Sequence, residues 1–531
     1  MKHLFEVDNK PFFPFGGQLH NSSAYTAEEL EQGWRALKLI KANTAEIPVY
    51  WEQVEPEEKK FDFSIVDTVI NGARVNGLKL ILLWFGTWKN GTMKFVPGWV
   101  KTNPEFYKRI TTHDGVSVPI LSSHCKANWD ADNKAFCALM EYIRRKDGNE
   151  RTIIAVQVQN EPGILGGTVR DYGEAAEKAF NGLVPSDLIE KMKKHCESPI
   201  YRVWLANGAK TRGTWRELFG NDADEFFTTF DIAGYIDAMA ASGKNIYNIP
   251  MYVNVWLDNQ GWNIPGLSYP SGGAVSKTLD IWKWTCRSID FIAPDIYKMD
   301  SRSYCEICGT YDREDNPLFI PESIMHESNS RNMFYALANH NVIGFHTFGI
   351  ESILTEEGKV RPEAEALVGS FQAAASVIPL IIKYRRTGNI HAVVQEEGMI
   401  EQYIELGNYI ALVKFSDGYT DYHHLQQEQS EGSVPDRGRG LVIQTGEREF
   451  YISGSGYRLF LSKKSTFKVM LSVCKTAENI QSRLIDYLSV DEGYFDKDEK
   501  WIVKRKRSGD ESDYGIWVKP DVGAVRVVMA D

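Results

Sequence analysis

The sequence predicts a (β/α)₈ TIM barrel with long loop insertions, followed by a C-terminal antiparallel β-sandwich domain. Strand-like apolar runs alternate with helical segments through about the first 385 residues, which favours a parallel sheet. Eight such units are present, as a closed barrel requires. Beyond Arg386 the runs become short and are separated by Gly, Asp and Ser, which is typical of antiparallel strands.

Each expected barrel strand is a short apolar run, and most end in polar or aromatic residues. In order they cover residues 13–21, 42–51, 78–85, 153–160, 249–256, 289–297, 318–323 and 342–348. The first helix begins at Thr26, where Glu29 completes the spacing of a capping box. A final helix over residues 362–384 is expected to close the ring.

Two long inserts interrupt the alternation, at residues 86–151 and 164–244. The first carries an amphipathic helix near residues 133–145, and the second is mostly helical. Both follow barrel strands, so they are expected at the catalytic face. The change to short strand-like runs beyond Arg386 predicts a domain boundary there, with the barrel in residues 1–387 and the β domain in residues 388–531. Its expected strands are residues 409–415, 440–444, 448–452, 457–461 and 467–473.

Composition limits the possible partners. The 531 residues are 43% hydrophobic and 25% charged, as in globular proteins, and the chain is too long for one core. A net charge of −11 disfavours nucleic acid, and the basic run 504–507 is expected to be a solvated loop. No apolar run reaches the roughly 18 residues of a membrane span, so no membrane partner is expected.

The cysteines and the N-terminal residues indicate the cellular compartment of the protein. Seven scattered cysteines are most simply reduced thiols of a cytoplasmic protein. The first residues contain no signal peptide, although a mature secreted form with its leader removed is not excluded. Cys305 and Cys308 have zinc-like spacing but no second pair nearby, and Gln18 stands where metal-dependent barrels often have the first histidine of a His-x-His pair. Neither a metal nor another cofactor is expected.

Two glutamates stand at the ends of expected strands. Glu161 follows the fourth strand, between Asn160 and Pro162, and Glu322 ends the seventh. A lone Glu after a strand is usually a solvated carboxylate, but two across one barrel are the groups that a glycosidase needs. One must be protonated to donate to the leaving oxygen, and the other must be ionised to attack the anomeric carbon.

These stretches resemble the large clan of retaining barrel glycosidases. The resemblance rests on Asn160-Glu161-Pro162 after the fourth strand and on Glu322 after the seventh. It implies that Glu161 is the acid/base, Glu322 the nucleophile and Asn160 a ligand of the sugar 2-hydroxyl. It also implies that Tyr297, at the end of the sixth strand, touches the nucleophile.

Within that clan the chain most resembles glycoside hydrolase family 35, in particular a bacterial β-galactosidase subgroup with a compact C-terminal β domain. Residues 17–20, 42–46, 77–84 and 153–161 carry this resemblance, which extends over about residues 10–385. The Asn-Glu-Pro sequence is also common in sister families, including family 42, whose members are also β-galactosidases.

Other strand ends supply polar and aromatic side chains that suit a sugar pocket, because sugars present flat C–H faces as well as hydroxyl groups. Trp84 and Trp88 fit a sugar platform and a core position equally well, and the histidines are expected to form hydrogen bonds. The further substrate-binding candidates are His20, Asn21, Glu46, Tyr50, Trp84, Trp88, Asn254, Trp256, His346 and Glu351.

The expected function is a retaining exo-β-glycosidase, foremost a β-galactosidase, acting on an oligosaccharide or another glycoside. The alternatives are another exo-activity of the clan, such as a β-glucosidase or pentopyranosidase, and a non-catalytic carbohydrate-binding protein. The β domain is expected to pack against the barrel or a neighbouring subunit, and a homo-oligomer is possible. Tyr422, His423 and His424 are expected at a solvated loop tip, with a second subunit's pocket as the less favoured location.

Overall fold

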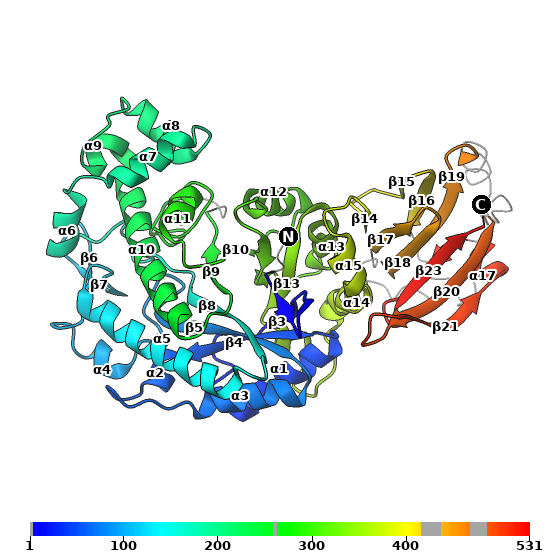
Figure 1. Ribbon diagram of the computed structural model, residues 1–531, viewed down its shortest axis with the longest axis horizontal. Coiled ribbons are helices and arrows are strands. Elements are labelled where there is room, and N and C mark those ends of the chain that lie inside the picture. The colour runs from blue at the N-terminus through cyan, green and yellow to red at the C-terminus, as the bar shows by residue number, and fades with distance from the viewer. Residues whose placement is uncertain (1–3, 259–262, 416–436, 468–485, 514, 531) are drawn as a thin grey trace.

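A ring of parallel strands forms the N-terminal part of the molecule, and a pair of antiparallel sheets forms the C-terminal part (Figure 1). The computed structural model describes residues 4–258, 263–415, 437–467, 486–513 and 515–530. Both parts agree with the fold class that the sequence predicts.

The ring runs in the order β11-β13-β3-β4-β5-β8-β9-β10-β12. These strands are β3 (Phe15–Gln18), β4 (Thr44–Tyr50), β5 (Lys79–Lys89), β8 (Ile153–Asn160), β9 (Met251–Trp256), β10 (Phe291–Ile296), β11 (Leu318–Ile320), β12 (Glu322–Ser323) and β13 (Val342–Phe348). The pieces β11 and β12 form one barrel strand, interrupted at Pro321. Because β11 pairs with β13 while β12 pairs with β10, this strand closes the ring.

The barrel strands are buried on both faces, which explains their continuous apolar runs. In β8 all eight residues are buried. A hairpin of β1 (Glu6–Val7) and β2 (Lys10–Pro11) precedes the barrel. Next to it, the Phe5 ring packs against Phe291 and Phe319, with centroids 5.9 and 5.8 Å away. An aromatic ring from the N-terminal segment therefore packs on side chains of β10 and β11.

The helices around the ring follow the expected alternation, and Thr26 and Glu29 form the predicted capping box of α1. They are α1 (Ala27–Leu39), α2 (Trp51–Val54), α3 (Ser64–Val75), α11 (Leu279–Thr285), α12 (Ser301–Tyr311), α13 (Asn329–Asn339), η2 (Ile350–Ile353), η3 (Pro362–Ala364), α14 (Glu365–Ala375) and α15 (Ile378–Tyr384).

The predicted single helix over residues 362–384 is broken. Residues 362–375 and 378–384 are bent by 61° relative to each other. Pro379 lies in the first turn of α15, where its missing N–H is tolerated, but it would disrupt the interior of a longer helix. Among the described residues no single helix has the length and apolar composition to cross a membrane, and this bent pair meets those criteria only when its two helices are combined.

The two inserts leave the ring after β5 and β8. The first contains α4 (Gly98–Lys101), β6 (Arg109–Thr111), β7 (Ser117–Leu121) and α5 (Lys126–Asp147). The second contains α6 (Glu174–Phe180), α7 (Ser186–Lys194), α8 (Pro199–Ala206), α9 (Trp215–Phe219), η1 (Gly220–Asp222) and α10 (Ala223–Ile246). The helices α7, α8 and α9 form a projecting lobe (upper left in Figure 1) with an apolar core that includes Leu188, Trp204 and Trp215.

The C-terminal part is a sandwich of a six-stranded and a four-stranded antiparallel sheet. The strands of the six-stranded sheet lie in the order β14 (Ile390–Val394), β17 (Arg439–Gly446), β18 (Glu449–Ser455), β23 (Ala524–Met529), β20 (Tyr487–Phe495) and β21 (Trp501–Arg507). Those of the four-stranded sheet lie in the order β15 (Glu401–Leu406), β16 (Tyr409–Phe415), β19 (Tyr457–Lys463) and β22 (Ile516–Trp517). The short helix α17 (Asp510–Asp513) follows β21. Four of the expected strands match β16 to β19. Residues 468–473 of the fifth lie outside the described residues, as do Tyr422, His423 and His424.

The six-stranded sheet is covered on both faces. Along β17, Leu441 and Ile443 join the apolar cluster that continues into the barrel, whereas Val442 belongs to the cluster between the two sheets. This alternation follows from the two-residue period of a strand. The barrel-facing side packs on α13 and α14. The β domain is therefore fixed to the barrel by a shared core.

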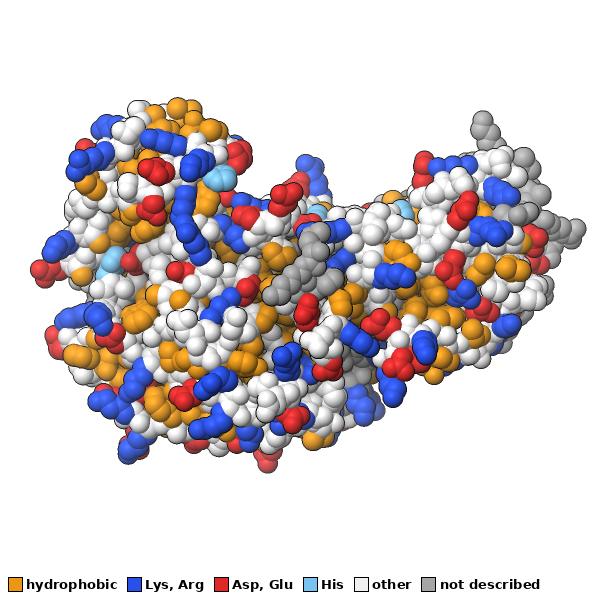
Figure 2. All heavy atoms as spheres, viewed as in Figure 1, with side chains coloured by type: hydrophobic (Ala, Val, Ile, Leu, Met, Phe, Trp, Pro, Cys, Tyr) orange, Lys and Arg blue, Asp and Glu red, His pale blue; other side chains and the backbone are white. Residues whose placement is uncertain are grey.

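The basic run 504–507 is not a solvated loop, as the sequence suggested, but part of the edge strand β21. Its residues Lys504 to Lys506 are exposed, as is common on edge strands, where charges discourage pairing with other chains. Arg507 is buried, pairs with Glu492 and lies 3.5 Å from the centroid of the Trp517 ring. On the face shown in Figure 2, basic and acidic side chains are interspersed.

Candidate active site

Glu161 directly follows β8 and is held in an unusual backbone conformation. Its φ is 44° and that of Gln159 is 67°, a left-handed region that residues other than glycine seldom adopt. The Glu161 N–H donates to Asn254 Oδ1 at 2.8 Å, and its carbonyl accepts from the Gly91 N–H at 3.1 Å. Such strain persists only where the surroundings fix it, and it is frequent at functional sites.

Glu322 begins β12 and accepts hydrogen bonds on both carboxylate oxygens. Oε1 accepts from Gln18 Nε2 at 2.8 Å and from Asn254 Nδ2 at 3.4 Å. Oε2 accepts from the Tyr297 hydroxyl at 2.7 Å. Hydrogen bonds from several donors stabilise a carboxylate in its charged form and fix its direction.

A third carboxylate, Asp295 at the end of β10, lies between these two. One oxygen from each of Glu161, Asp295 and Glu322 lies within 4.8 Å of those of the other two. All three side chains are buried. Retaining glycosidases hold their two carboxyl groups about 5–5.5 Å apart, whereas inverting enzymes leave about 6.5–9.5 Å for a water molecule. The spacing of Glu161 and Glu322 suits the retaining geometry.

Burial and neighbouring negative charges raise the pKa values of Glu161 and Asp295. Burial first, and then the charge of Glu322, raises the pKa of Glu161 from 4.5 to about 7. The positive charge of Lys89 acts in the opposite direction. Burial, followed by the charges of Glu322 and Glu161, raises the pKa of Asp295 well above its usual value. The cluster therefore retains protons near neutral pH.

Lys89, at the end of β5, sets the orientation of Asn160. Its Nζ donates to Asn160 Oδ1 at 2.7 Å in the buried interior. An ammonium group can only donate, so the amide must turn its oxygen toward Lys89. The Asn160 Nδ2 is then left buried and has no partner among the described residues. A substrate hydroxyl can therefore accept a hydrogen bond from it.

The carboxylates open into a pocket of about 230 Å³. Three of the predicted site residues besides the glutamates line it, namely Asn21, Trp256 and Tyr297. Asn254 lies just behind, between Glu161 and Glu322. The complete lining is Asn21, Lys89, Asn90, Glu161, Trp256, Leu257, Asp295, Tyr297, Glu322 and Phe348.

Four predicted residues lie near this pocket but are bonded to one another. Glu46 is fully buried and accepts from His346 Nδ1 at 2.8 Å. His20 Nε2 lies 2.6 Å from Ser352 Oγ, and the His20 N–H donates to Glu351 Oε1 at 2.8 Å. None of the four lines the pocket, and Glu46 Oε2, His346 Nε2 and Glu351 Oε2 are buried without a partner among the described residues.

The structure places Trp84, Trp88 and Tyr50 in the core instead of on a pocket wall, contrary to their selection as substrate-binding candidates. Trp84 is fully buried and donates from Nε1 to Asp132 Oδ1 at 2.8 Å. The Trp88 ring packs edge-on against Tyr235, with centroids 4.9 Å apart. Tyr50 stacks on Tyr25 at 4.3 Å. Each of these rings thus packs on or bonds to a partner at least 25 residues away in the chain.

Three residues that contact the glutamates or Asn160 were not selected from the sequence, namely Gln18, Lys89 and Asp295. The pocket-lining residues Asn90, Leu257 and Phe348 were not selected either. Asp295 lies two residues before Tyr297, so the period of a strand places both on one face, and this signal was available. Lys89 was missed because the expected third strand ended at Phe85, whereas β5 continues to Lys89. Gln18 entered the sequence analysis only as the residue that replaces the first histidine of a metal-binding His-x-His pair.

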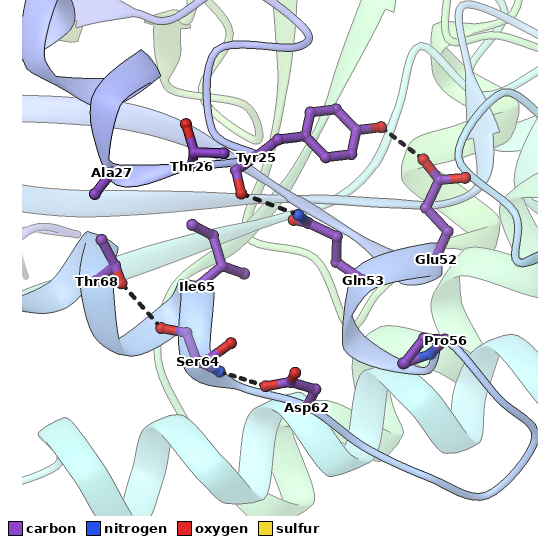
Figure 3. Close-up of a pocket in the computed structure, with 10 residues that line it drawn as sticks. All are labelled: Tyr25, Thr26, Ala27, Glu52, Gln53, Pro56, Asp62, Ser64, Ile65 and Thr68. Atoms are coloured by element: carbon purple, nitrogen blue, oxygen red, sulfur yellow. Dashed lines mark hydrogen bonds between the residues drawn. The ribbon is translucent and has the colours of Figure 1, made fainter.

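A larger groove of about 450 Å³ lies away from the carboxylates, beside α1, α2 and α3 (Figure 3). Its polar side chains bond mainly within the groove, as in the Tyr25 hydroxyl to Glu52 at 2.6 Å and the Ser64 N–H to Asp62 at 2.8 Å. Its two carboxylates, Glu52 and Asp62, are each bonded to a neighbouring group, whereas those of the smaller pocket adjoin one another, so the smaller pocket is the candidate active site.

Metal-ligating side chains converge at one place within the described residues. That place is the cluster of Glu161, Asp295 and Glu322 itself. Cys305 and Cys308, on α12, have no third ligand close enough to share an ion in the described part of the chain.

Two family models match the chain. Residues 20–222 match glycoside hydrolase family 42, described as beta-galactosidase. Residues 367–519 match a family described only as a domain of unknown function, DUF5597. This range includes most of α14 and much of the β domain. No curated protein matches the chain in sequence.

Solved structures share the fold. One is a catalytic mutant of Gan42B, a family 42 beta-galactosidase from G. stearothermophilus, at 14% identity and a TM-score of 0.51, over 72% of this chain and 58% of that one. Another is the beta-galactosidase of the psychrophilic Marinomonas ef1, at 10% identity and a TM-score of 0.50, over 70% and 60%. The chain thus covers less than two thirds of either galactosidase.

These matches correct the family suggested by the sequence. The family 35 assignment is not supported, because the matching model is that of family 42. The Asn-Glu-Pro sequence at 160–162, which the sequence analysis associated with family 42 among others, was the more informative signal. The N-terminal part of this chain is a TIM barrel, of which residues 20–222 are similar to family 42.

Proposed function

We propose that this protein is a retaining exo-β-glycosidase whose substrates are β-galactosides. The observation that carries the proposal is the contrast between two buried glutamates whose oxygens lie within 4.8 Å of each other. Glu322 accepts hydrogen bonds from three side chains, and the pKa of Glu161 is raised to about 7. The family 42 match supports galactose as the sugar.

In the first step, a carboxylate oxygen of Glu322 attacks the anomeric carbon as the bond to the leaving oxygen breaks. Glu161 gives its proton to that oxygen. A covalent glycosyl ester forms on Glu322, and Glu161 becomes a carboxylate. In the second step Glu161 takes a proton from water, whose oxygen attacks the anomeric carbon and releases Glu322. Two inversions give net retention.

The Asn160 amide donates to the sugar from its free Nδ2, because Lys89 holds the other end of the amide. Trp256 supplies an aromatic surface to the pocket. The volume of about 230 Å³ is below the roughly 300–1,000 Å³ typical of drug-sized ligand sites. It suits a single sugar ring, which is the reason for proposing exo-action.

A panel of nitrophenyl glycosides tests this function. We expect the β-galactoside to have the highest kcat/KM, ahead of the β-glucoside, the β-xyloside and the α-arabinopyranoside. Proton NMR should detect the β-anomer as the first product, and an oligosaccharide should release only monosaccharide. A preference for the glucoside or a pentoside would replace galactose by that sugar. Binding without turnover of any substrate would instead indicate a carbohydrate-binding protein.

A further inference from the structure

Asp295 has no part in the two-carboxylate mechanism, yet it lies beside both glutamates. Its Oδ2 accepts a hydrogen bond from Asn254 Nδ2 at 2.8 Å. Its Oδ1 is buried and has no donor among the described residues. Glu161 Oε2 is in the same situation. Two buried acceptor oxygens of adjacent carboxyl groups are unfavourable unless a proton lies between them.

The position of that proton follows from the contacts. One oxygen of Asp295 lies within 4.8 Å of one of Glu161, and two carboxyl groups can share a hydrogen bond only when one of them is protonated. Asn254 already donates to Asp295 Oδ2, so a proton on Asp295 belongs on Oδ1. The same Asn254 accepts from the Glu161 N–H at 2.8 Å and thereby fixes the Asp295 carboxyl group relative to the backbone of Glu161.

We propose that Asp295 is a positioning residue that stays protonated through the reaction and donates a hydrogen bond from Oδ1 to the Glu161 carboxyl group. The inference rests on the proposed glycosidase function. When Glu161 transfers its proton to the leaving oxygen, it gains a negative charge, and the hydrogen bond from Asp295 becomes stronger. Asp295 therefore stabilises the transition state without giving up its own proton.

The groups around Asp295 favour this protonation. Burial contributes most, and the charges of Glu322 and Glu161 act in the same direction. Lys89, from β5, is the cation whose charge opposes them. Other titratable groups that face Asp295 are the hydroxyls of Tyr252 on β9, Tyr297 after β10 and Tyr311 on α12, which are neutral because the pKa of each is raised, by burial first.

The test compares Asp295→Asn with Asp295→Ala in pH profiles of kcat/KM. An Asn amide can still donate to Glu161, so the basic limb should stay where it is in the wild-type enzyme. Alanine removes the donor, which should raise the pKa of Glu161 and move the basic limb to higher pH. If Asp295 were ionised, both variants would remove a negative charge and move the limb to lower pH. That result, or unmoved limbs in both variants, would overturn the proposal.

Infrared spectroscopy supplies a readout that does not need turnover. At a pH well above the value of about 7 for Glu161, the difference spectrum of wild type minus Asp295→Asn should contain the C=O band of a protonated carboxyl group. Asp114→Asn, at a site 89% exposed, is the matched control and should give no such band. Absence of the band would refute the protonated Asp295. A band in a protein that hydrolyses no glycoside would refute the proposed function alone.

Discussion

The ends of β8 and β12 present the same side chain in two different settings. At β12, Glu322 accepts hydrogen bonds from Gln18, Asn254 and Tyr297. At β8, Glu161 has a fixed backbone, but its side chain faces another carboxyl group, and its pKa is raised to about 7. Donors favour an ionised nucleophile, and burial beside negative charge favours a protonated acid. The difference teaches that the neighbours, not the residue type, set the role.

The largest effect should come from replacing Glu322. Without a carboxylate that can attack, Glu322→Gly should lose more than the roughly 10²–10⁴-fold that general acid–base catalysis contributes. Added azide should restore turnover and give a glycosyl azide of inverted configuration. If Glu322→Gly kept the wild-type rate, the two roles would have to be reassigned.

Replacing Glu161 should have an effect that depends on the leaving group. Glu161→Ala should lose roughly 10²–10⁴-fold on alkyl glycosides, which need protonation, and much less on dinitrophenyl glycosides. Azide should here give a product of retained configuration, opposite to that of Glu322→Gly. Equal losses on both classes of substrate would contradict an acid role.

The donors of Glu322 allow a finer comparison. Tyr297→Phe removes a hydrogen bond to a charged group, worth about 1.5–3 kcal/mol, so kcat/KM should fall roughly 10–150-fold. Tyr457→Phe is the matched control, because the Tyr457 hydroxyl donates to the neutral carbonyl of Ser453 in the β domain. It should lower stability and leave kcat/KM unchanged. A similar loss of kcat/KM in both variants would show that the Tyr297 effect is structural.

The smallest expected effect concerns Lys89. Its charge lowers the pKa of Glu161, so Lys89→Met should raise that pKa and move the basic limb of the kcat/KM profile above its wild-type position near pH 7. The Asn160 amide would also lose its fixed orientation, which should increase KM several-fold. Lys126→Met, at an exposed pair with Asp130, should do neither. A basic limb that moves to lower pH would contradict the electrostatic role of Lys89.

The barrel and its two glutamates could be predicted because local patterns determine them. Apolar runs give the strands, and the polar residues that end them lie at one face of the ring. The destinations of individual side chains depend on partners distant in sequence. Trp84 is held in the core by Asp132, 48 residues later, and no local pattern identifies that bond.

The remaining errors have similar causes. The helix predicted over residues 362–384 is broken near Pro379. The apolar pattern continues on both sides of the break, so it indicated one helix. The charge of the basic run 504–507 suggested a solvated loop. In the structure Arg507 is buried, because it pairs with Glu492 and packs on the Trp517 ring. Asp295 could have been selected, because it lies near the end of β10 and two residues before Tyr297.

The strand order of the β domain has a consequence for synthesis on the ribosome. Strand β23 lies between β18 and β20, although it is the last strand of the domain to be translated. While residues 524–529 remain in the exit tunnel, β18 is an unprotected edge, and β20 and β21 have no link to the sheet that covers the barrel. Until this segment emerges, the barrel can therefore close while the sheet that covers it stays open.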